Sequence, residues 1–232
     1  MHGNYAPNML TNEADLLLAV GMRFDDRVTG DVSRYAKQAR VVHIDIDAAE
    51  IGKIVEGALP VVGDAREALA LLTPLVQKKE RAEWLSTFSR YHRQEEEKII
   101  DPQVRRDSGE LSMAEVIRAL SDKTNGEALL VADVGQHQMM AARYYQFRRP
   151  NSFISSGGLG TMGFGVPAAM GAKFAAPQRQ VVAVVGDGGF QMTMQEMATL
   201  AQENLPVKIV LLNNCFLGMV RQWQELFFDN RY

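Results

Sequence analysis

Two predicted strand ends in the second half of the sequence carry residue types that bind a hard cation. The apolar run 181–185 leads into Asp187 between two glycines, and the apolar run 207–212 leads into Asn213 and Asn214. A helical pattern lies between the runs, and a β-α-β unit in one sheet places both carboxyl ends at one edge. One carboxylate and a side-chain carbonyl suit Mg²⁺, which completes its octahedron with phosphate oxygens and water. The pattern predicts a holder for a metal diphosphate, and two purely structural turns are the alternative.

Two further motifs follow predicted strands in this half. Gln136 and His137 come after the apolar run 128–133 and open a predicted helix, where they can donate to a phosphate; a capping histidine is the alternative. The stretch 157–165 has the G-x-G-x-x-G spacing of a dinucleotide site. Pro167 delays the following helix, and no strand-end acid lies about 20 residues further on. We therefore favour glycine backbone that approaches a flat ring closely.

The first part of the sequence carries a second set of candidates. Asp45 ends the apolar run 40–46, at the place of a ribose-binding acid in nucleotide folds. Beyond another apolar run, Arg23 and Arg27 flank two acids. These arginines are predicted to meet a diphosphate or a carboxylate, and a solvated charge cluster is the alternative.

The last candidates lie on a predicted helix after the asparagine pair. Met219 and Trp223 are four residues apart, so they share one face of that helix. We expect this face to point towards the proposed metal site.

Parallel sheets are the elements that must position these residues, because the apolar runs are nearly continuous, as in strands buried on both faces. We predict an α/β fold of two incomplete parallel-sheet domains, residues 1–77 and 112–232, joined by a charged connector at 78–111. Strands are predicted at 15–21, 40–46, 60–64, 128–133, 152–156, 181–185 and 207–212. Helices are predicted at 65–78, where Pro74 kinks or ends the helix early, and at 137–146, 166–175 and 193–203. Capping boxes are predicted at Ser112 with Glu115 and at Thr193 with Glu196.

The bulk composition excludes several classes of protein. The 232 residues are 47% hydrophobic and 23% charged, which is ordinary for a globular protein in water. A net charge of −3 argues against nucleic acid or an anionic membrane as the main partner. A single cysteine, Cys215, excludes an internal disulfide framework and fits a reducing compartment. No apolar run approaches the roughly 18 residues of a membrane span. A cytoplasmic protein is expected.

Taken together, the motifs resemble those of one enzyme family. The Gly-Asp-Gly and Asn-Asn pair is similar to the thiamine-diphosphate motif. The stretches "GMRFDDRVTG", "VVHIDIDAAEIGK", "GQHQM", "SSGGLGTMGFGVPAA" and "LGMVRQWQELF" resemble acetohydroxyacid synthase (acetolactate synthase) catalytic large subunits. The resemblance covers nearly the whole chain apart from the connector.

The resemblance implies an architecture of three α/β domains. They bind, in order, the pyrimidine ring, FAD and the diphosphate of the cofactor. This chain resembles the latter part of the central FAD-binding domain and the first part of the diphosphate-binding domain. The glutamate that promotes cofactor activation belongs to the first domain, so the isolated chain is expected to be inactive.

The resemblance also implies roles for individual residues. Mg²⁺ ligands are expected at Asp187, Asn214 and the backbone carbonyl of Phe216. Thiamine diphosphate contacts are expected at Gln136, His137, Gly160, Thr161, Met162, Gly188, Gly189, Cys215, Leu217 and Gly218, of which Thr161 and Cys215 depart from the family's usual residues. FAD contacts are expected at Met1, His2, Gly21, Met22, Arg23, Phe24, Asp25, Asp45, Ile46, Asp64 and Ala65. Catalytic positions are expected at Met219, Trp223 and Arg27, the last two selecting the second 2-oxoacid.

The reaction implied by the resemblance is a carboligation by a transferase. Pyruvate is decarboxylated and its two-carbon remainder is joined to a second pyruvate or to 2-oxobutyrate, the first common step of branched-chain amino acid biosynthesis. FAD would be structural, and the partners would be further copies in a homodimer or homotetramer and a small regulatory subunit. The alternatives are another thiamine-diphosphate enzyme, such as pyruvate oxidase or glyoxylate carboligase, and a non-catalytic fragment that needs a partner.

Overall fold

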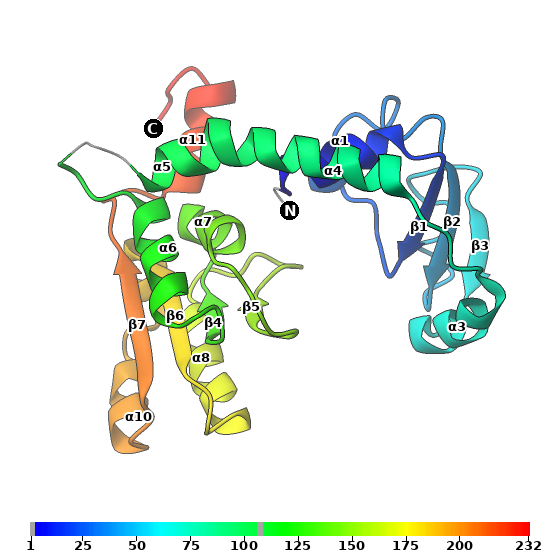
Figure 1. Cartoon of the computed structure of the whole chain (residues 1–232). Helices are drawn as coiled ribbons and strands as arrows, with labels where there is room; N and C mark the ends of the chain where they lie inside the picture. The colour runs from blue at the N-terminus through cyan, green and yellow to red at the C-terminus, as the bar shows by residue number, and fades with distance from the viewer. Residues whose placement is uncertain (1–2, 106–108) are drawn as a thin grey trace. The chain divides into compact units, whose positions relative to one another are not determined.

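Two parallel sheets organise the chain in the computed structural model (Figure 1), which describes residues 3–105 and 109–232. The chain divides into unit 1, Met1–Ile99, and unit 2, Ile100–Tyr232, and the division falls inside the region predicted as the connector. The α/β fold class with two parallel sheets is confirmed. Among the residues described, none of the helices combines the length and apolarity that a membrane span requires.

Unit 1 contains a three-stranded parallel sheet in the order β1-β2-β3. Its elements are α1 (Tyr5–Glu13), β1 (Leu16–Val20), α2 (Asp26–Thr29), β2 (Arg40–Asp45), β3 (Leu59–Val62), α3 (Ala65–Leu72), the 3₁₀ turn Thr73–Leu75, α4 (Ala82–Glu95) and the π-helical turn Glu96–Ile100, which ends at the unit boundary. The Pro74 prediction is confirmed, because α3 ends at Leu72 and the proline lies in the 3₁₀ turn.

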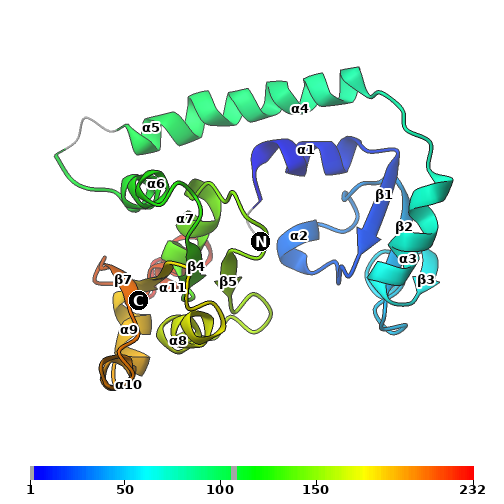
Figure 2. The ribbon, with the colours of Figure 1, turned by 60° about the horizontal axis from the view of Figure 1, so that its bottom comes forward.

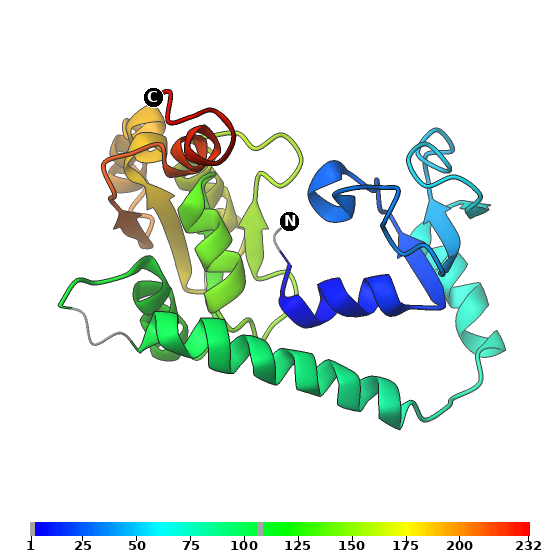
Figure 3. The same ribbon diagram turned by 90° about the horizontal axis from the view of Figure 1, so that it is seen from above.

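The strands of unit 1 are less covered than their composition suggests. Burial on both faces was the expectation, and it is wrong for the outer strands, since Leu16 of β1 is 55% and Leu59 of β3 is 61% exposed. Helix α1 packs along α4, as Figure 3 shows. Tyr5 and Tyr91 meet edge to face with ring centroids 5.4 Å apart. These two helices therefore bury part of their apolar surface against each other.

Unit 2 contains a four-stranded parallel sheet in the order β5-β4-β6-β7. Its elements are α5 (Asp101–Val104), α6 (Met113–Lys123), β4 (Leu129–Ala132), α7 (Gln136–Tyr144), β5 (Phe153–Ser155), α8 (Gly165–Ala175), β6 (Val181–Gly186), α9 (Asp187–Thr193), α10 (Glu196–Gln202), β7 (Val207–Leu212) and α11 (Gly218–Phe227). The predicted parallel pairing of β6 with β7 is confirmed.

The sheet of unit 2 is covered by helices on both faces, as Figure 2 shows. On one face α6 and α7 pack against alternate residues of β4 and β6, around Ile117, Leu130 and Val182. On the other face α8 packs against the intervening residues, around Val131 and Val166. Every residue of β4 and β6 is buried, as their unbroken apolar runs predict.

One predicted helix start is wrong, and the difference shapes the site. Helix α9 begins at Asp187, directly after β6, instead of at Thr193. The capping box of Thr193 with Glu196 does not form, because the Thr193 hydroxyl donates to the carbonyl of Gly163 at 3.0 Å. Helix α10 then begins at Glu196 without a side-chain cap. Asp187 is therefore the first residue of a helix and not part of a loop.

The capping box at the start of α6 is confirmed and supports a stability prediction. The Ser112 hydroxyl accepts from Glu115 N at 3.1 Å, and Ser112 N donates to the Glu115 carboxylate at 2.7 Å. Ser112→Ala should lower the free energy of unfolding in urea by about 1 kcal/mol, because it removes a helix cap. Ser86→Ala, inside α4, is the matched control, since it removes a hydroxyl that caps no helix end. An equal effect of both substitutions would contradict the capping role.

Candidate functional site

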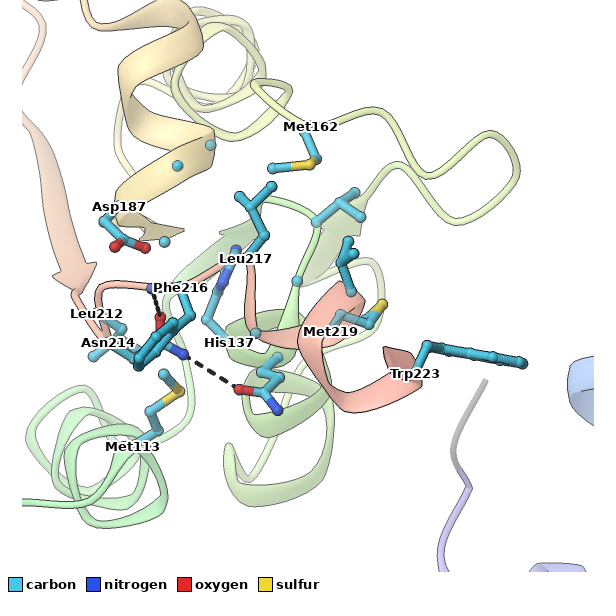
Figure 4. Close-up of a pocket in the computed structure, with 18 of the residues that line it drawn as sticks. Met113, His137, Met162, Asp187, Leu212, Asn214, Phe216, Leu217, Met219 and Trp223 are labelled. Atoms are coloured by element: carbon cyan, nitrogen blue, oxygen red, sulfur yellow. Dashed lines mark hydrogen bonds between the residues drawn. The ribbon is translucent and has the colours of Figure 1, made fainter. Parts of the chain in front are cut away.

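The loops at the carboxyl ends of the strands of unit 2, together with α11, border a cavity of about 490 Å³ (Figure 4). Most of the residues predicted for the diphosphate-binding half line it. They are Gln136, His137, Gly160, Met162, Asp187, Gly188, Gly189, Asn214, Phe216, Leu217, Gly218, Met219 and Trp223. Thr161 and Cys215 are not among the lining residues, and Cys215 is exposed.

Several lining residues were not expected from the sequence. These are Met113, Val134, Gly135, Gly186, Leu212, Val220 and Phe228. The sequence could have indicated Gly135 and Gly186, because each directly precedes a predicted site residue. No motif in the sequence indicated Met113, which lines the cavity from the start of α6 and is distant in sequence from the other site residues.

Asp133 is the most consequential residue that the sequence reasoning missed. Its carboxylate is fully buried and accepts from three backbone N–H groups: Val134 at 2.5 Å, Gly163 at 3.0 Å and Gly165 at 3.0 Å. These bonds join the end of β4 to the glycine-rich loop and to the start of α8. Because the loop is held in this way, Gly160 and Met162 are brought to the cavity wall. A strand that ends in an acid was the available signal.

His137 lies against backbone that has no side chains. A Cβ on Gly135 would meet the ring Cε1 at 2.6 Å, and a Cβ on Gly186 would meet it at 2.9 Å. The ring is hydrogen-bonded to the backbone of Asp133, and Nε2 is buried with no hydrogen-bond partner among the described residues. Burial lowers the pKa of His137, and the charges of Asp133 and Asp187 oppose that shift. A neutral imidazole with one nitrogen unpaired thus lines the cavity.

The loop after β7 presents Asn214 in a defined orientation. The side-chain Nδ2 donates to Gln136 Oε1 at 3.3 Å, and Oδ1 accepts from Phe216 N at 3.2 Å. Cys215 has a φ of 61°, so the chain turns sharply between Asn214 and Phe216. Figure 4 shows the Asp187 carboxylate and Asn214 on the same side of the cavity.

The donor set at this point fits Mg²⁺ bound through a phosphate group. Among the residues that the structure describes, no group of three or more His, Cys, Asp or Glu side chains forms a metal site. Asp187 supplies the one carboxylate among the residues that line the cavity, and Asn214 supplies an amide oxygen. One carboxylate with carbonyl oxygens suits Mg²⁺, which retains water and phosphate oxygens as its other ligands.

The first turn of α9 contains two glycines, Gly188 and Gly189, so its backbone lies beside the cavity without covering side chains at these positions. A Cβ on Gly188 would meet Leu217 Cδ2 at 2.6 Å, and a Cβ on Gly189 would meet the Asp133 carboxyl carbon at 2.9 Å. The N–H groups of a first helical turn have no acceptor within the helix, so they are available to phosphate oxygens. Met162, Leu217 and Met219 supply apolar wall nearby. The cavity therefore fits a cofactor with a diphosphate end and an apolar ring end.

The residues predicted for FAD belong to unit 1, and several of them lie at the carboxyl edge of its sheet. Gly21 N donates to Ile44 O at 2.9 Å, and Gly63 N donates to Asp45 O at 2.9 Å, so the turns after β1 and β3 lie beside the end of β2. Asp64 caps α3 by accepting from Arg66 N at 2.8 Å. The other predicted residues of this unit that the structure describes are Met22, Arg23, Phe24, Asp25, Arg27, Ile46 and Ala65. Met1 and His2 lie outside the described residues.

A separate cavity of about 440 Å³ borders part of this set. Arg23, Phe24 and Asp25 line it together with Glu50 and Lys53. Asp25 caps α2 by accepting from Arg27 N at 2.9 Å, and its other oxygen accepts from Arg23 Nε at 3.0 Å. The Arg23 bond and the Arg27 N–H hold the pKa of Asp25 below its usual value, although its partial desolvation opposes them. The charge cluster is thus ordered around Asp25.

Comparison with known proteins identifies the family. Residues 133–232 match the C-terminal TPP-binding domain of thiamine pyrophosphate enzymes, and residues 1–72 match the central domain of the same enzymes. The chain belongs to the thiamine pyrophosphate enzymes. The resemblance predicted from the motifs is confirmed, and the cofactor of this family is the one that the cavity in unit 2 fits.

Similar proteins narrow the position within the family. The whole chain is 46% identical to the acetolactate synthase large subunit of Lactococcus lactis and 48% identical to that of Corynebacterium glutamicum. It is 45% identical to the acetolactate synthase isozyme 3 large subunit of Escherichia coli. The chain spans 40%, 37% and 41% of the lengths of these relatives, respectively.

The lowered pKa of His137 predicts a pH dependence of stability. Below the ordinary histidine pKa of about 6.5 the unfolded chain binds more protons than the folded chain. His137 therefore stabilises the fold most above that pH, and the stabilisation is lost as pH falls through the lowered pKa. Between about pH 7.5 and pH 5, the free energy of unfolding in urea should fall less in His137→Gln than in the wild type. An equal fall in both proteins would contradict the assignment, because His43 and His92 are present in both.

Proposed function

We propose that this chain carries out part of an acetolactate synthase reaction, in which pyruvate is decarboxylated and its two-carbon remainder is joined to a second pyruvate or to 2-oxobutyrate. One observation carries the proposal. Asp187, Asn214 and His137 surround a single cavity in unit 2, in a chain that is similar over its whole length to acetolactate synthase large subunits.

Unit 2 is proposed to hold thiamine diphosphate through Mg²⁺. Asp187, the Asn214 amide oxygen and the Phe216 carbonyl would ligate the ion. Gly188 and Gly189 would donate backbone N–H groups to the diphosphate, as would Gln136 and His137 from their side chains. His137 can donate through Nε2 only when that nitrogen carries a proton, so diphosphate binding favours its protonated form. The ring end of the cofactor would lie against Gly160, Thr161 and Met162 on one side and against Cys215, Leu217 and Gly218 on the other.

The cofactor supplies the electron sink that decarboxylation of a 2-oxoacid requires. The chain's own contribution is to orient it and to keep water from the reacting carbon. Met219 and Trp223 lie one helical turn apart on α11 and both line the cavity, and the Trp223 ring packs on Phe227 with centroids 4.8 Å apart. This apolar face is proposed to receive the side chain of the second 2-oxoacid. The role of Arg27 towards that substrate is a prediction from the family resemblance.

Unit 1 is proposed to contribute to an FAD site with a structural role. The turn after β1, Asp45 at the end of β2 and Asp64 after β3 lie at one sheet edge, where open α/β sheets bind ligands. We take residues 1–77 as part of this flavin-binding domain, 78–111 as the connector and 112–232 as part of the diphosphate-binding domain. Further copies of the chain and a small regulatory subunit are proposed partners, in the cytoplasm.

A chimera tests the proposal directly. The chain would replace the matching segment of the Lactococcus lactis large subunit, and acetolactate would be measured as acetoin by colorimetry. We expect activity from the chimera with pyruvate, thiamine diphosphate, Mg²⁺ and FAD, and none from the chain alone. A folded chimera that binds thiamine diphosphate but forms no acetolactate would contradict the proposed reaction.

Asp187→Ala or Asn214→Ala should abolish Mg²⁺-dependent binding of thiamine diphosphate. Both side chains lie at strand ends and contribute little to the core, so circular dichroism should show an unchanged fold. Calorimetric titration of the cofactor, with and without Mg²⁺, measures the effect. Asn213→Ala is the matched control, because Asn213 is not among the proposed ligands and its side chain accepts from Cys215 N in the same turn. Wild-type affinity in either ligand variant would remove that residue from the metal site.

Trp223→Leu, made in the active chimera, should weaken the preference for 2-oxobutyrate over pyruvate as second substrate. The contact of an indole ring with one extra methylene is worth roughly 10–200-fold in selectivity. Decarboxylation of the first pyruvate should continue. Chromatographic analysis of the products from a mixture of the two 2-oxoacids measures the ratio, and an unchanged ratio would place Trp223 outside the acceptor site.

A further inference from the structure

A fully buried histidine in unit 1 has no evident role in packing alone. His43 lies on β2, the central strand of the sheet, and within the described part of the chain neither ring nitrogen has a hydrogen-bond partner. A buried polar group without a partner destabilises a fold, and an apolar side chain of similar size would avoid that cost. Such a group calls for an explanation.

His43 has two neighbours, Phe24 and Asp45, that indicate a role for its ring. Its ring meets the Phe24 ring edge to face, with centroids 5.1 Å apart and an interplanar angle of 87°. Its Nε2 lies 3.9 Å from a carboxylate oxygen of Asp45, which closes the same strand. His43 therefore contacts the turn after β1 and lies beside the acid at the end of β2.

The backbone of the turn after β1 is strained at Phe24. Phe24 has a φ of 51°, which is unusual for a bulky residue, yet its ring is buried between His43 and Tyr35. A strained conformation persists only where the surroundings hold it, and such positions cluster at ligand sites. The buried ring fixes the backbone between Arg23 and Asp25, whose side chains pair with each other at 3.0 Å.

We propose that His43 is a positioning residue for the cofactor at this sheet edge. Its ring holds Phe24 and thereby the turn after β1, and the N–H of its Nε2 orients the Asp45 carboxylate towards cofactor hydroxyl groups. The contact at 3.9 Å is longer than a hydrogen bond, so it acts here as a charge–dipole contact that shortens when the cofactor draws the carboxylate into place. The inference rests on the proposed function in one respect, namely that Asp45 contacts FAD.

A double-mutant cycle tests whether His43 acts through Asp45. FAD affinity would be measured by quenching of flavin fluorescence in the chimera described above, carrying the wild-type segment, His43→Phe, Asp45→Asn or both substitutions. His43→Phe keeps an aromatic ring against Phe24 and removes the nitrogen, so it should weaken FAD binding roughly 10-fold. The double variant should bind no more weakly than Asp45→Asn, because the two residues act as one unit.

Stability measurements separate this role from simple packing. His43→Phe should unfold in urea at the same or a higher concentration than the wild type, since the ring is kept and two unpartnered nitrogens are lost. Ile44→Val is the matched control: Ile44 is buried on the opposite face of the same strand, and its shortening should leave FAD affinity unchanged. Where His43→Phe does not fold, His43→Leu replaces it in the cycle.

The outcomes distinguish the inference from the proposed function. Wild-type affinity in His43→Phe, or losses that add in the double variant, would overturn the positioning role while leaving the flavin site intact. A folded chimera with the wild-type segment that does not quench flavin fluorescence would overturn the flavin site of unit 1, and the role of His43 with it. Weakened binding, non-additive losses and retained stability together would establish it.

Discussion

The buried carboxylate of Asp133 is the interaction on which the site of unit 2 depends. Three backbone N–H groups converge on it, from its own strand end, the glycine-rich loop and the start of α8. Gly165 and Gly189 approach so closely that a Cβ on either would meet Asp133 atoms at 2.9 Å. A buried carboxylate with unsatisfied oxygens destabilises a fold, so these donors are obligatory and not incidental. Strand, loop and both helices are thereby held in one arrangement.

The chemistry of the cavity follows from that arrangement. With α8 and α9 held against Asp133, the first turn of α9 is left as bare backbone beside the cavity, and the His137 ring fills the space between Gly135 and Gly186. The same burial lowers the pKa of His137 and leaves Nε2 without a hydrogen-bond partner in the described part of the chain. An anionic ligand is the partner that satisfies both the open N–H groups and a protonated imidazole. Polar groups gather at the strand ends, while α11 supplies the apolar wall.

In unit 1, as in unit 2, polar residues lie at the carboxyl ends of the parallel strands, but their hydrogen bonds differ. Its strand ends also carry glycine or acid, at Gly21, Asp45 and Asp64, but each acid is used by nearby backbone as a turn or helix cap. Its outer strands expose Leu16 and Leu59, and the outer strand β7 of unit 2 likewise exposes Leu211. Nearly continuous apolar strands are typical of parallel sheets that helices cover on both faces. The two units thus share a parallel sheet with polar residues at its carboxyl edge, and they differ in strand order and in how the acids at that edge are used.

The sequence alone determined the strands and the parallel pairing of β6 with β7, because these depend on apolar runs and on the helical pattern between them. It also determined the cap of α6 and the end of α3 before Pro74, because each depends on residues within a few positions of the helix end. It also brought Asp187 and Asn214 to one sheet edge, since parallel strands share a direction. Tertiary structure alone decided the rest. Thr193 bonds Gly163, thirty positions away, instead of capping a helix, and Asp133 gathers N–H groups from residues equally distant in sequence. These hydrogen bonds depend on which donors and acceptors come together once the elements have packed, and a local sequence pattern carries no information on that.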